Sequence, residues 1–398
     1  MLIVKKFGGT SVADKEKIKH VADLCVKEYE KGNQLVVVLS AMGNKTDELL
    51  AQAKDMNPKA PKRELDMLLT TGEQISVALL AMALSGLGVP AISFHAFQAG
   101  IRTTNHHGNA SIKDIDIHSI RYQLDKKKIV IVTGFQGIND HGDYTTLGRG
   151  GSDTTAVALA AALSADACEI YTDVDGVYTA DPSVIITARK LEEIKYDEML
   201  ELASLGAGVL HNRSVEVAKK YNVPLVVRSS LNNGYGTVIK DKTDIEKKVI
   251  KGVTTDTAAY IAIKAKLKGM DSLLIVFKHL AKRNICADVI LFSENNADLK
   301  FLVARDNVLE VLEVIKMLEE TLQYEELIVE DKVSKLSIVG IGVMSDPAIA
   351  PQLFETFYEE NIPIKMISTS EIKITVVMDE IFTQRAIKAV HEKFMLSN

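Results

Sequence analysis

The chain has 398 residues, of which 47% are hydrophobic and 25% are charged, and its net charge is −6. This is the composition of a globular protein, and the acidic balance argues against a surface for nucleic acid or an anionic membrane. At roughly 150 residues per domain, the length predicts two or three domains. The three cysteines lie far apart without a CxxC pair, which excludes a disulfide framework and a zinc knuckle.

The first residues, 1–8, have the pattern of a β-strand that begins at once. They lack a charged leader followed by an apolar stretch, and no apolar run in the chain reaches the ~18 residues that a membrane helix needs. We therefore expect no signal peptide, no membrane partner and a cytoplasmic location.

Short apolar runs alternate with helical patterns through the first 230 residues. Continuous apolar runs of this kind are typical of strands that are covered on both faces, and a helical stretch such as 155–164 separates them. The alternation predicts a mostly parallel sheet with helices on both sides. The runs stand at residues 2–4, 35–39, 89–92, 129–132 and 224–227.

A polar stretch at 232–243, rich in Asn, Gly, Lys and Asp, indicates the end of this domain, which we place at 1–243. Beyond it the order strand, helix, strand, strand, helix occurs twice, with opening strands expected at 259–265 and 335–341. Asn284-Ile285 and Asn361-Ile362 occupy the same place in the two copies. Such an internal repeat predicts two βαββα units. We place them at 244–330 and 331–398, with the first strand of the earlier unit free to pair with the later unit.

Glycine-rich turns follow the first two apolar runs. The turn at 6–9 combines two glycines, which let the backbone approach phosphate oxygens, with Lys6, which can neutralise them. The turn at 40–43 repeats this design, and Thr46 follows it. Each turn also fits an ordinary connection to a capped helix, so neither identifies a phosphate site alone.

The densest motif is GRGGSDTT at 148–155, which leads directly into an apolar helix. Arg149 can bind a carboxylate through two hydrogen bonds, and Ser152 with the backbone N–H groups could hold phosphoryl oxygens. Asp153 has two open interpretations, as the N-cap of the helix or as a catalytic group. Glu73 likewise either favours the dipole of the apolar helix that it opens or binds a substrate ammonium.

A polar turn, YTDVDGVYTADP at 171–182, follows another short strand. Its two tyrosines and Val177 could enclose an adenine, and Asp173 could orient a ribose or a metal-bound water. The DxDG spacing is also found in calcium loops, but the Glu that an EF-hand requires further on is absent. The histidines show no HExxH or other ligand spacing, so we predict no metal site made by the protein.

Taken together, these motifs resemble those of the aspartate kinases. KFGGTSV, SAMG, TTGEQIS, GFQG, LGRGGSDTTA and YTDVDGVYTADP stand in the order found in that family, and MISTSEIKI at 366–374 resembles its ACT regulatory region. The resemblance covers essentially the whole chain. It implies an α/β fold in which an amino-acid-kinase αβα sandwich is followed by two βαββα ACT-like domains.

The resemblance also implies an activity. A member of this family uses ATP and Mg²⁺ to phosphorylate the side-chain carboxylate of L-aspartate to 4-phospho-L-aspartate, the first step of the branch that leads to lysine, threonine and methionine. Lysine, threonine or both would act as effectors through the ACT domains, which would also join copies of the chain into a homodimer or a larger homo-oligomer.

Site residues are carried over from the family by motif. The catalytic residues would be Lys6 on the phosphates, Asp153 orienting Lys6, and Arg149 at a substrate carboxylate. ATP contacts would come from Lys6, Phe7, Gly8, Gly9, Ser40, Ser152, Thr172, Asp173, Tyr178 and Asp181. Aspartate contacts would come from Thr46, Glu73, Arg149, Gly150, Gly151 and Ser152. Effector contacts would come from Met344, Ser345, Ile367, Ser368 and Thr369. Mg²⁺ would be carried by ATP, without ligands from the protein.

Two departures from the family pattern leave questions open. Gly208 stands where many members have a lysine, so a second cation on the ATP phosphates is absent or supplied differently. The first ACT-like unit has Lys268–Asp271 where a Pro-Gly turn is common and Phe292 where a polar Gln often meets the effector. Whether that unit binds a ligand stays open.

Two other functions fit parts of the sequence. The first is a kinase for acetylglutamate, glutamate or UMP, which the ACT-like tail and the GRGGSDTT motif disfavour. The second is a non-catalytic amino-acid sensor, which the intact Lys6, Arg149 and Asp153 disfavour.

Overall fold

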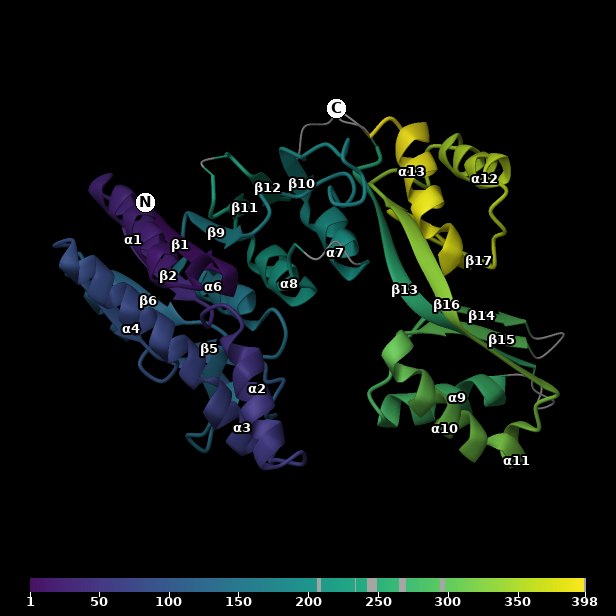
Figure 1. Cartoon of the computed structure of the whole chain (residues 1–398), viewed down its shortest axis with the longest axis horizontal. Coiled ribbons are helices and arrows are strands. Elements are labelled where there is room, and N and C mark those ends of the chain that lie inside the picture. Colours follow the sequence, from purple (N-terminus) through teal and green to yellow (C-terminus); the bar gives the residue numbers. More distant parts are fainter. Residues whose placement is uncertain (206–208, 233, 242–248, 265–269, 294–297, 397–398) are drawn as a thin grey trace. The chain divides into compact units, whose positions relative to one another are not determined.

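The computed structural model describes residues 1–205, 209–232, 234–241, 249–264, 270–293 and 298–396 (Figure 1). The chain forms two compact units. The first unit contains residues 1–177, 190–204 and 208–246, and the second contains 178–189, 205–207 and 247–398. The boundary that we predict after residue 243, like Gly208 and Lys268, lies outside the described residues.

The first unit is built on an eight-stranded sheet with the order β10-β12-β11-β9-β1-β2-β6-β3. Its neighbouring strands are parallel except for β11 and β12, and β1 and β6, neither of which is an edge strand, are buried along their whole length. The predicted mostly parallel sheet is therefore confirmed. The strands are β1 (Leu2–Phe7), β2 (Gln34–Leu39), β3 (Ala91–Phe94), β6 (Ile129–Thr133), β9 (Ala167–Thr172), β10 (Glu193–Lys195), β11 (Leu225–Ser229) and β12 (Thr237–Lys240).

Helices cover both faces of this sheet (Figure 1). On one face, α1 (Lys15–Glu30) and α4 (Thr71–Gly86) pack into a core cluster with Phe7, Val37 and Ile131. On the other face, α6 (Gly151–Leu163) packs against β1, β2 and α8 (Asn212–Tyr221). The remaining helices are α2 (Lys45–Met56), α3 (Lys62–Leu69), α5 (His118–Asp125) and α7 (Tyr196–Ser204).

The segment 62–86 passes for a membrane helix by length and composition. Within it, however, Val77, Leu80 and Leu84 are buried in the core cluster beneath α1. That is the position of a core helix in a globular unit, and the same explanation holds for the apolar α6, which is buried on nearly every side.

A smaller four-stranded sheet, with the order β5-β4-β7-β8, belongs to the same unit and was not predicted. Its strands are β4 (Ile101–Thr103), β5 (Ile112–Ile115), β7 (Gln136–Ile138) and β8 (Tyr144–Thr146). They are three or four residues long, which is too short for an alternating pattern to stand out in the sequence.

The second unit contains one six-stranded antiparallel sheet with the order β14-β15-β13-β16-β18-β17. The opening strands of the two βαββα units, β13 (Gly252–Lys264) and β16 (Glu326–Val339), pair with each other and are longer than expected. The other elements are α9 (Met270–Lys282), β14 (Ala287–Ser293), β15 (Asp298–Val303), α10 (Val308–Met317), α11 (Glu319–Leu322), α12 (Ile349–Glu359), β17 (Met366–Ser370), β18 (Lys373–Asp379) and α13 (Thr383–Lys393).

The repeated Asn-Ile pair has the same structure in both copies. Asn284 and Asn361 take left-handed φ values of 56° and 51°, after α9 and α12 respectively. The following Ile285 and Ile362 are buried, and their backbone N–H groups donate to Leu280 O at 3.1 Å and Phe357 O at 2.9 Å. Both pairs therefore end a helix and return the chain to the core.

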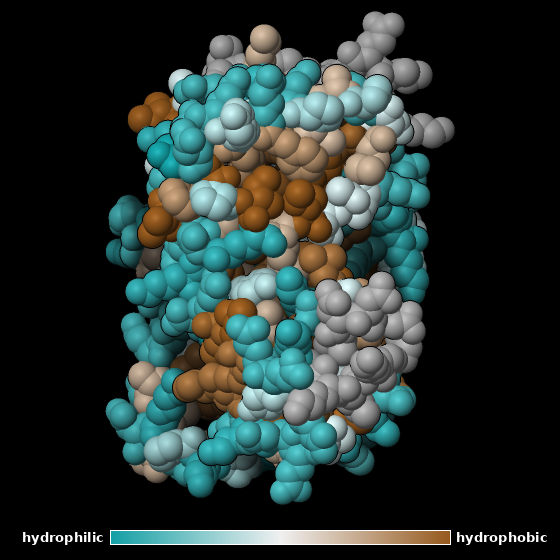
Figure 2. All heavy atoms as spheres, turned by 90° about the vertical axis from the view of Figure 1, so that its right-hand side faces the viewer, coloured by the Kyte–Doolittle hydropathy of each residue, from teal (hydrophilic) through white to brown (hydrophobic). Residues whose placement is uncertain are grey.

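Apolar side chains also remain open on the strands of this unit. Ile290, Leu291, Ile328 and Ile367, on β14, β16 and β17, are each more than a third exposed. Figure 2, which faces the second unit, shows hydrophobic side chains gathered between hydrophilic ones. Such a surface is typical of a region that contacts another protein.

Candidate active site

A cavity of about 600 Å³ opens in the first unit. The carboxyl ends of β1 and β2 and the first turns of α2, α4 and α6 contribute to its wall, the position where parallel sheets commonly bind ligands. The structure brings together many of the predicted residues there, although they come from four separate motifs. Those that line the cavity are Lys6, Gly9, Ser40, Thr46, Glu73, Arg149, Gly150, Gly151, Ser152 and Asp153.

Lys6 and Asp153 form an ion pair at the wall of this cavity. Lys6 Nζ lies 2.6 Å from Asp153 Oδ1, and both side chains are nearly buried. Asp153 stands in the first turn of α6, but the N-cap residue of that helix is Gly150. The N-cap interpretation of Asp153 is therefore wrong, and its carboxylate instead holds the Lys6 ammonium in place.

Two glycines allow the turns of the cavity to fit together. Gly9 accepts a hydrogen bond from Gly43 N at 3.0 Å, and a Cβ on Gly9 would lie 2.8 Å from Ala41 O. Gly150 has a φ of 66°, and a Cβ there would lie 2.2 Å from the Cβ of His211. Larger side chains at either position would push the turns apart, so the glycines keep the backbone close to the cavity.

Glu73 is a buried carboxylate with one free oxygen. Its Oε1 accepts a hydrogen bond from Ala41 N at 3.2 Å, whereas Oε2 has no hydrogen-bond partner among the described residues. Burial raises the pKa of Glu73 to about 8. A cation in the cavity would stabilise the charged form of this group and lower its pKa. The position of Glu73 in the first turn of α4 also suits the helix dipole, so both predicted roles are compatible.

Arg149 is exposed on the rim of the cavity and pairs with no carboxylate in the part of the chain that the structure describes. Its loop is held from behind by Arg213, which the sequence analysis missed. Arg213 donates from Nη1 to Leu147 O at 2.8 Å and from Nη2 to Ala110 O at 2.6 Å. Burial lowers the pKa of Arg213 from its ordinary value. Arg149 is thus free to meet a ligand while Arg213 fixes its backbone.

Asp66 is a second residue that the sequence analysis missed. It is fully buried in α3, and its carboxylate accepts hydrogen bonds from Thr146 Oγ1 at 2.7 Å, Thr146 N at 3.1 Å and Gly108 N at 3.0 Å. His107 Nδ1 lies 3.0 Å from the same carboxylate. Through its hydrogen bonds to Thr146, Asp66 ties α3 to β8. It also lines the cavity and so forms part of its wall. One sequence signal could have identified Asp66: it is a carboxylate that shares the inward side of a short helix with the buried Leu69.

The predicted ATP contacts near β9 lie outside the cavity wall. Phe7 is buried and stacks on the ring of Tyr171, with centroids 4.6 Å apart, so neither ring is open to a nucleotide. Thr172 Oγ1 donates to Asp173 Oδ1 at 2.9 Å at the carboxyl end of β9. Gly8 N donates to Tyr171 O at 3.2 Å, which places the glycine turn next to that strand end.

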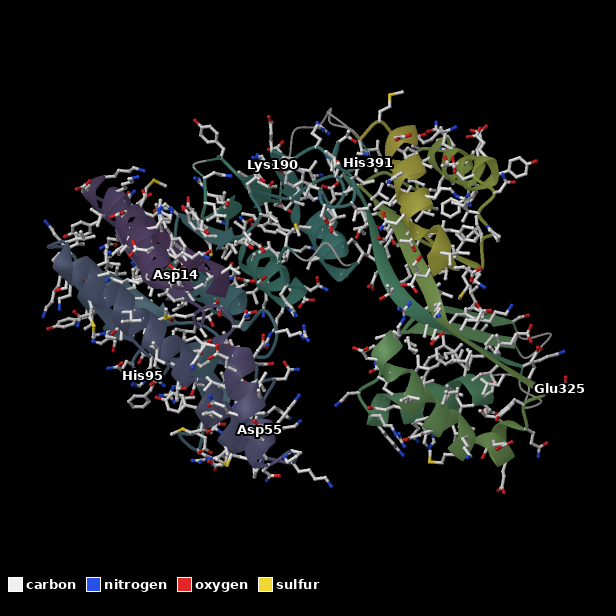
Figure 3. The ribbon with its side chains drawn as sticks, viewed as in Figure 1. Asp14, Asp55, His95, Lys190, Glu325 and His391 are labelled. Atoms are coloured by element: carbon white, nitrogen blue, oxygen red, sulfur yellow. The ribbon has the colours of Figure 1, made fainter. Side chains whose placement is uncertain are left out.

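Tyr178 and Asp181 belong to the second unit. Tyr178 packs against its core cluster, and Asp181 Oδ1 accepts hydrogen bonds from Ser183 N and Oγ at 2.8 and 2.7 Å. Between them, Thr179 Oγ1 lies 3.0 Å from Nε2 of the buried His391 on α13 (Figure 3). The segment 178–189 is therefore part of the second unit, although the chain reaches it directly from β9.

The predicted effector contacts also lie in the second unit. Ile367, Ser368 and Thr369 stand on β17, the edge strand of the six-stranded sheet. Met344 is half exposed, and Ser345 N donates to Gly342 O at 2.9 Å in the turn after β16. Over the described residues of both units, no three His, Cys, Asp or Glu side chains cluster as metal ligands would.

Two family models match the chain. Residues 1–229 match the amino acid kinase family, and residues 336–394 match an ACT domain. The first match spans more than half of the chain and contains the whole cavity. It defines the class of the first unit as an amino acid kinase, with a regulatory type of domain in the second.

Full-length relatives are more specific. Aspartokinase 2 of Bacillus subtilis is 49% identical over 100% of this chain and 98% of its own length. Aspartokinase of Corynebacterium glutamicum is 46% identical over 99% of this chain and 96% of its own. The chain therefore belongs to the aspartokinase family, a family of kinases.

Solved structures agree with this membership. E. coli aspartokinase III, crystallised with aspartate and ADP in its R-state, is similar with a TM-score of 0.84 at 25% identity, covering 99% of this chain and 100% of that one. The T-state of the same enzyme, with lysine and aspartate, gives a TM-score of 0.78 at 25% identity, with 99% of each chain covered. The predicted fold of an amino-acid-kinase sandwich followed by ACT-like units is thereby confirmed.

Proposed function

We propose that this chain transfers the γ-phosphoryl group of ATP to the side-chain carboxylate of L-aspartate, which gives 4-phospho-L-aspartate. The observation that carries the proposal is a single cavity that combines the Lys6–Asp153 ion pair, the free oxygen of buried Glu73, and Arg149. E. coli aspartokinase III, which is similar over its full length, has been crystallised with aspartate and ADP. The cavity therefore contains a cation that can bind phosphates, together with a carboxylate and a guanidinium that can bind the ammonium and a carboxylate of an amino acid.

The reaction needs no general base. An aspartate side chain, with an ordinary pKa near 4, is already ionised at neutral pH and can attack the γ-phosphorus directly. Among the residues that the structure describes, no histidine lines the cavity. The barrier is electrostatic because an anion approaches a polyanion. Lys6, positioned by Asp153, and the backbone N–H groups at the start of α6 would neutralise the oxygens of the transferred group.

Mg²⁺ would bind together with ATP. Because the described residues hold no cluster of three carboxylate, histidine or cysteine side chains, the ion would be held mainly by the phosphate oxygens and water, as Mg²⁺ often is in kinases. Its contribution would be to offset the charge of the phosphates. Thr172 and Asp173 remain proposed contacts of the nucleotide, whereas Tyr178 and Asp181, which belong to the second unit, stay predictions from the family resemblance.

Aspartate would be oriented by two charged groups. The free Oε2 of Glu73 would accept a hydrogen bond from the α-ammonium, and Arg149 would bind a carboxylate through two hydrogen bonds. Thr46, Gly150, Gly151 and Ser152 would complete the contacts. An ammonium beside Glu73 would also offset the free-energy cost of burying that carboxylate, because it would give the charged form of Glu73 an ion-pair partner.

The second unit would regulate the first. We propose lysine, threonine or both as effectors, bound at Met344, Ser345 and the β17 residues 367–369. E. coli aspartokinase III has been crystallised with lysine in a T-state. The exposed apolar side chains on β14, β16 and β17 support a homodimer or larger homo-oligomer formed through the ACT-like units at 244–330 and 331–398. The kinase domain would end near 243.

We further propose that the enzyme works in the cytoplasm at the first step of the branch to lysine, threonine and methionine. The activity is tested by measuring ADP release with aspartate, glutamate, acetylglutamate and UMP as acceptors. We expect release with aspartate alone, and trapping of the acyl phosphate by hydroxylamine. Release with another acceptor would replace the proposed substrate, and amino-acid binding without ADP release would indicate a sensor.

A further inference from the structure

Lys5, the neighbour of Lys6, belongs to a buried ionic cluster that the proposed mechanism does not use. The two lysines point to opposite faces of β1, because Lys6 meets Asp153 of α6 whereas Lys5 meets Glu28 of α1. Lys5 Nζ lies 3.0 Å from Glu28 Oε2 and 3.2 Å from Glu169 Oε2, and the residue is only 3% exposed. The cluster ties β1 to α1 and β9.

Glu169 connects this cluster to two more groups. Its Oε1 lies 3.2 Å from Arg228 Nη2 on β11, and its Oε2 accepts a hydrogen bond from the Tyr171 hydroxyl at 3.0 Å. Lys5 Nζ also donates to that hydroxyl at 3.4 Å. The register of the sheet dictates the arrangement, since Lys5 stands opposite Glu169 and Phe7 stands opposite Tyr171 on the parallel strand β9.

Tyr171 links the cluster to the glycine turn. Its hydroxyl is held by Lys5 and Glu169, its ring stacks on Phe7 with centroids 4.6 Å apart, and its carbonyl accepts the hydrogen bond of Gly8 N at 3.2 Å. Phe7 lies between Lys6 and Gly8 in the chain. A shift of the Tyr171 ring would therefore move both the ammonium of Lys6 and the turn that follows it.

Lys5 stays charged and Tyr171 stays neutral near neutral pH, because the pKa of each is raised. Burial alone would lower the pKa of Lys5, but the combined attraction of Tyr171, Glu169 and Glu28 outweighs it and raises the pKa above its ordinary value. Burial, followed by the charge of Glu169, raises the pKa of Tyr171 to about 12. A buried cluster with fixed charges contributes little net stability compared with apolar side chains of similar volume, and its best supported role is to specify position.

We infer that Lys5, Glu169 and Tyr171 form a positioning network that holds the Lys6 ammonium and the Gly8–Gly9 turn in the geometry needed for phosphoryl transfer. These residues are not among those that line the cavity, and they would act through Phe7 and the turn. The inference rests on the proposed role of Lys6, and it assigns a function in the reaction to the face of β1 that is turned away from the cavity.

The test uses the full-length chain and compares Lys5→Met, Lys5→Arg and Tyr171→Phe. We expect Lys5→Met to lower kcat roughly ten- to a hundredfold, because displacements of about 1 Å have such effects on positioned groups. Tyr171→Phe, which keeps the ring and removes the hydroxyl, should lower kcat several-fold. Lys5→Arg keeps the charge and should restore most of the activity. The KM for aspartate should stay within about twofold, because Glu73 and Arg149 stand on other elements.

Lys31→Met is the matched control. Lys31 Nζ lies 3.5 Å from the same Glu28 Oε2 but is 65% exposed, so this variant should keep its kcat. Rates are referred to the fraction of folded sites, counted by titration with nucleotide. A kcat within twofold of wild type in both Lys5→Met and Tyr171→Phe would overturn the inference. So would a fall in activity that disappears when the rate is divided by the concentration of folded sites.

Failure of this inference is distinguishable from failure of the proposed function. If Lys6→Ala abolishes turnover while Lys5→Met does not change it, the function stands and the positioning network falls. If Lys6→Ala itself retains turnover, the proposed role of Lys6 is contradicted, and the inference is contradicted with it because the network then has no catalytic group to position.

Discussion

The two faces of β1 carry the same side chain in contrasting surroundings. On the α1 face, Lys5 is enclosed by Glu28, Glu169 and Tyr171, and the Tyr171 hydroxyl also donates a hydrogen bond to Glu169. On the α6 face, Lys6 has Asp153 beside it and borders a cavity where Glu73 keeps a carboxylate oxygen without a partner among the described residues. Buried polar groups are normally paired, so a ligand that meets Glu73 Oε2 is what the proposed function predicts on the cavity face.

The largest expected effect comes from removing the cation on the cavity face. Lys6→Ala should lower kcat by at least about 10²–10³-fold, since a single positioned donor for developing charge is worth this much in enzymes. The melting temperature should fall as well, because Lys6→Ala leaves the nearly buried Asp153 carboxylate without its ion-pair partner. Steady-state ADP release and a melting curve measure both quantities. Turnover within tenfold of wild type would contradict the proposed role.

A smaller effect is expected from the free carboxylate. Glu73→Gln keeps the shape of the side chain but removes the charge that would meet the α-ammonium, so the KM for aspartate should rise roughly 10- to 100-fold, the worth of one hydrogen bond to a charged group. The KM for ATP serves as the internal control and should stay within about twofold. An unchanged KM for aspartate would exclude Glu73 from substrate binding.

The same residue predicts a pH dependence of stability. The pKa of Glu73 is about 8 in the folded chain against an ordinary value of 4.5. Between these values the folded state holds a proton that the unfolded chain releases, so the free energy of unfolding falls as pH rises from about 5 to 8. Glu73→Gln should lose this part of the slope. Denaturant unfolding at several pH values measures it, and parallel slopes in the two proteins would contradict the prediction.

The smallest effect is expected from Asp14→Ala, which tests whether kcat falls when a change on α1 outside the Lys5 cluster lowers the free energy of unfolding. Asp14 caps α1, which carries Glu28, by accepting a hydrogen bond from Lys17 N at 2.9 Å (Figure 3). Asp14→Ala should cost about 1 kcal/mol in the free energy of unfolding while kcat is unchanged. A fall in kcat as large as that of Lys5→Met would mean that the Lys5 cluster acts through stability and not through position.

The sequence allowed much of the site to be predicted because its chemistry lies in compact motifs. Lys6 stands beside a glycine turn at the end of the buried strand β1, and Arg149, Gly150, Ser152 and Asp153 stand in or beside the glycine run that opens the apolar helix α6. Asp66 and Arg213 could not be found in this way. Each acts through contacts with residues far away in the chain, Thr146 and Leu147 respectively, and no local pattern reports such contacts.

The segment after β9 shows a further limit. Residues 171–182 form one continuous motif, yet the structure divides it between the two units near Val177. Thr172 and Asp173 stay with the sheet, whereas Tyr178 packs into the core of the second unit and Thr179 meets His391. Proximity in sequence suggested one nucleotide wall, but burial of Tyr178 and its neighbours against the second core decided their place.

By itself, the sequence determined the parallel sheet, the glycine turns and the repeated βαββα units, because continuous apolar runs, special backbone angles and periodicity are local properties of a chain. Only the tertiary structure decided that Lys5, the neighbour of the predicted Lys6, is held in an ionic cluster on the opposite face of β1. Both lie on β1, and their difference arises from what packs on each face of that strand: α6, which begins with glycine, on one side, and α1 with Glu28 on the other.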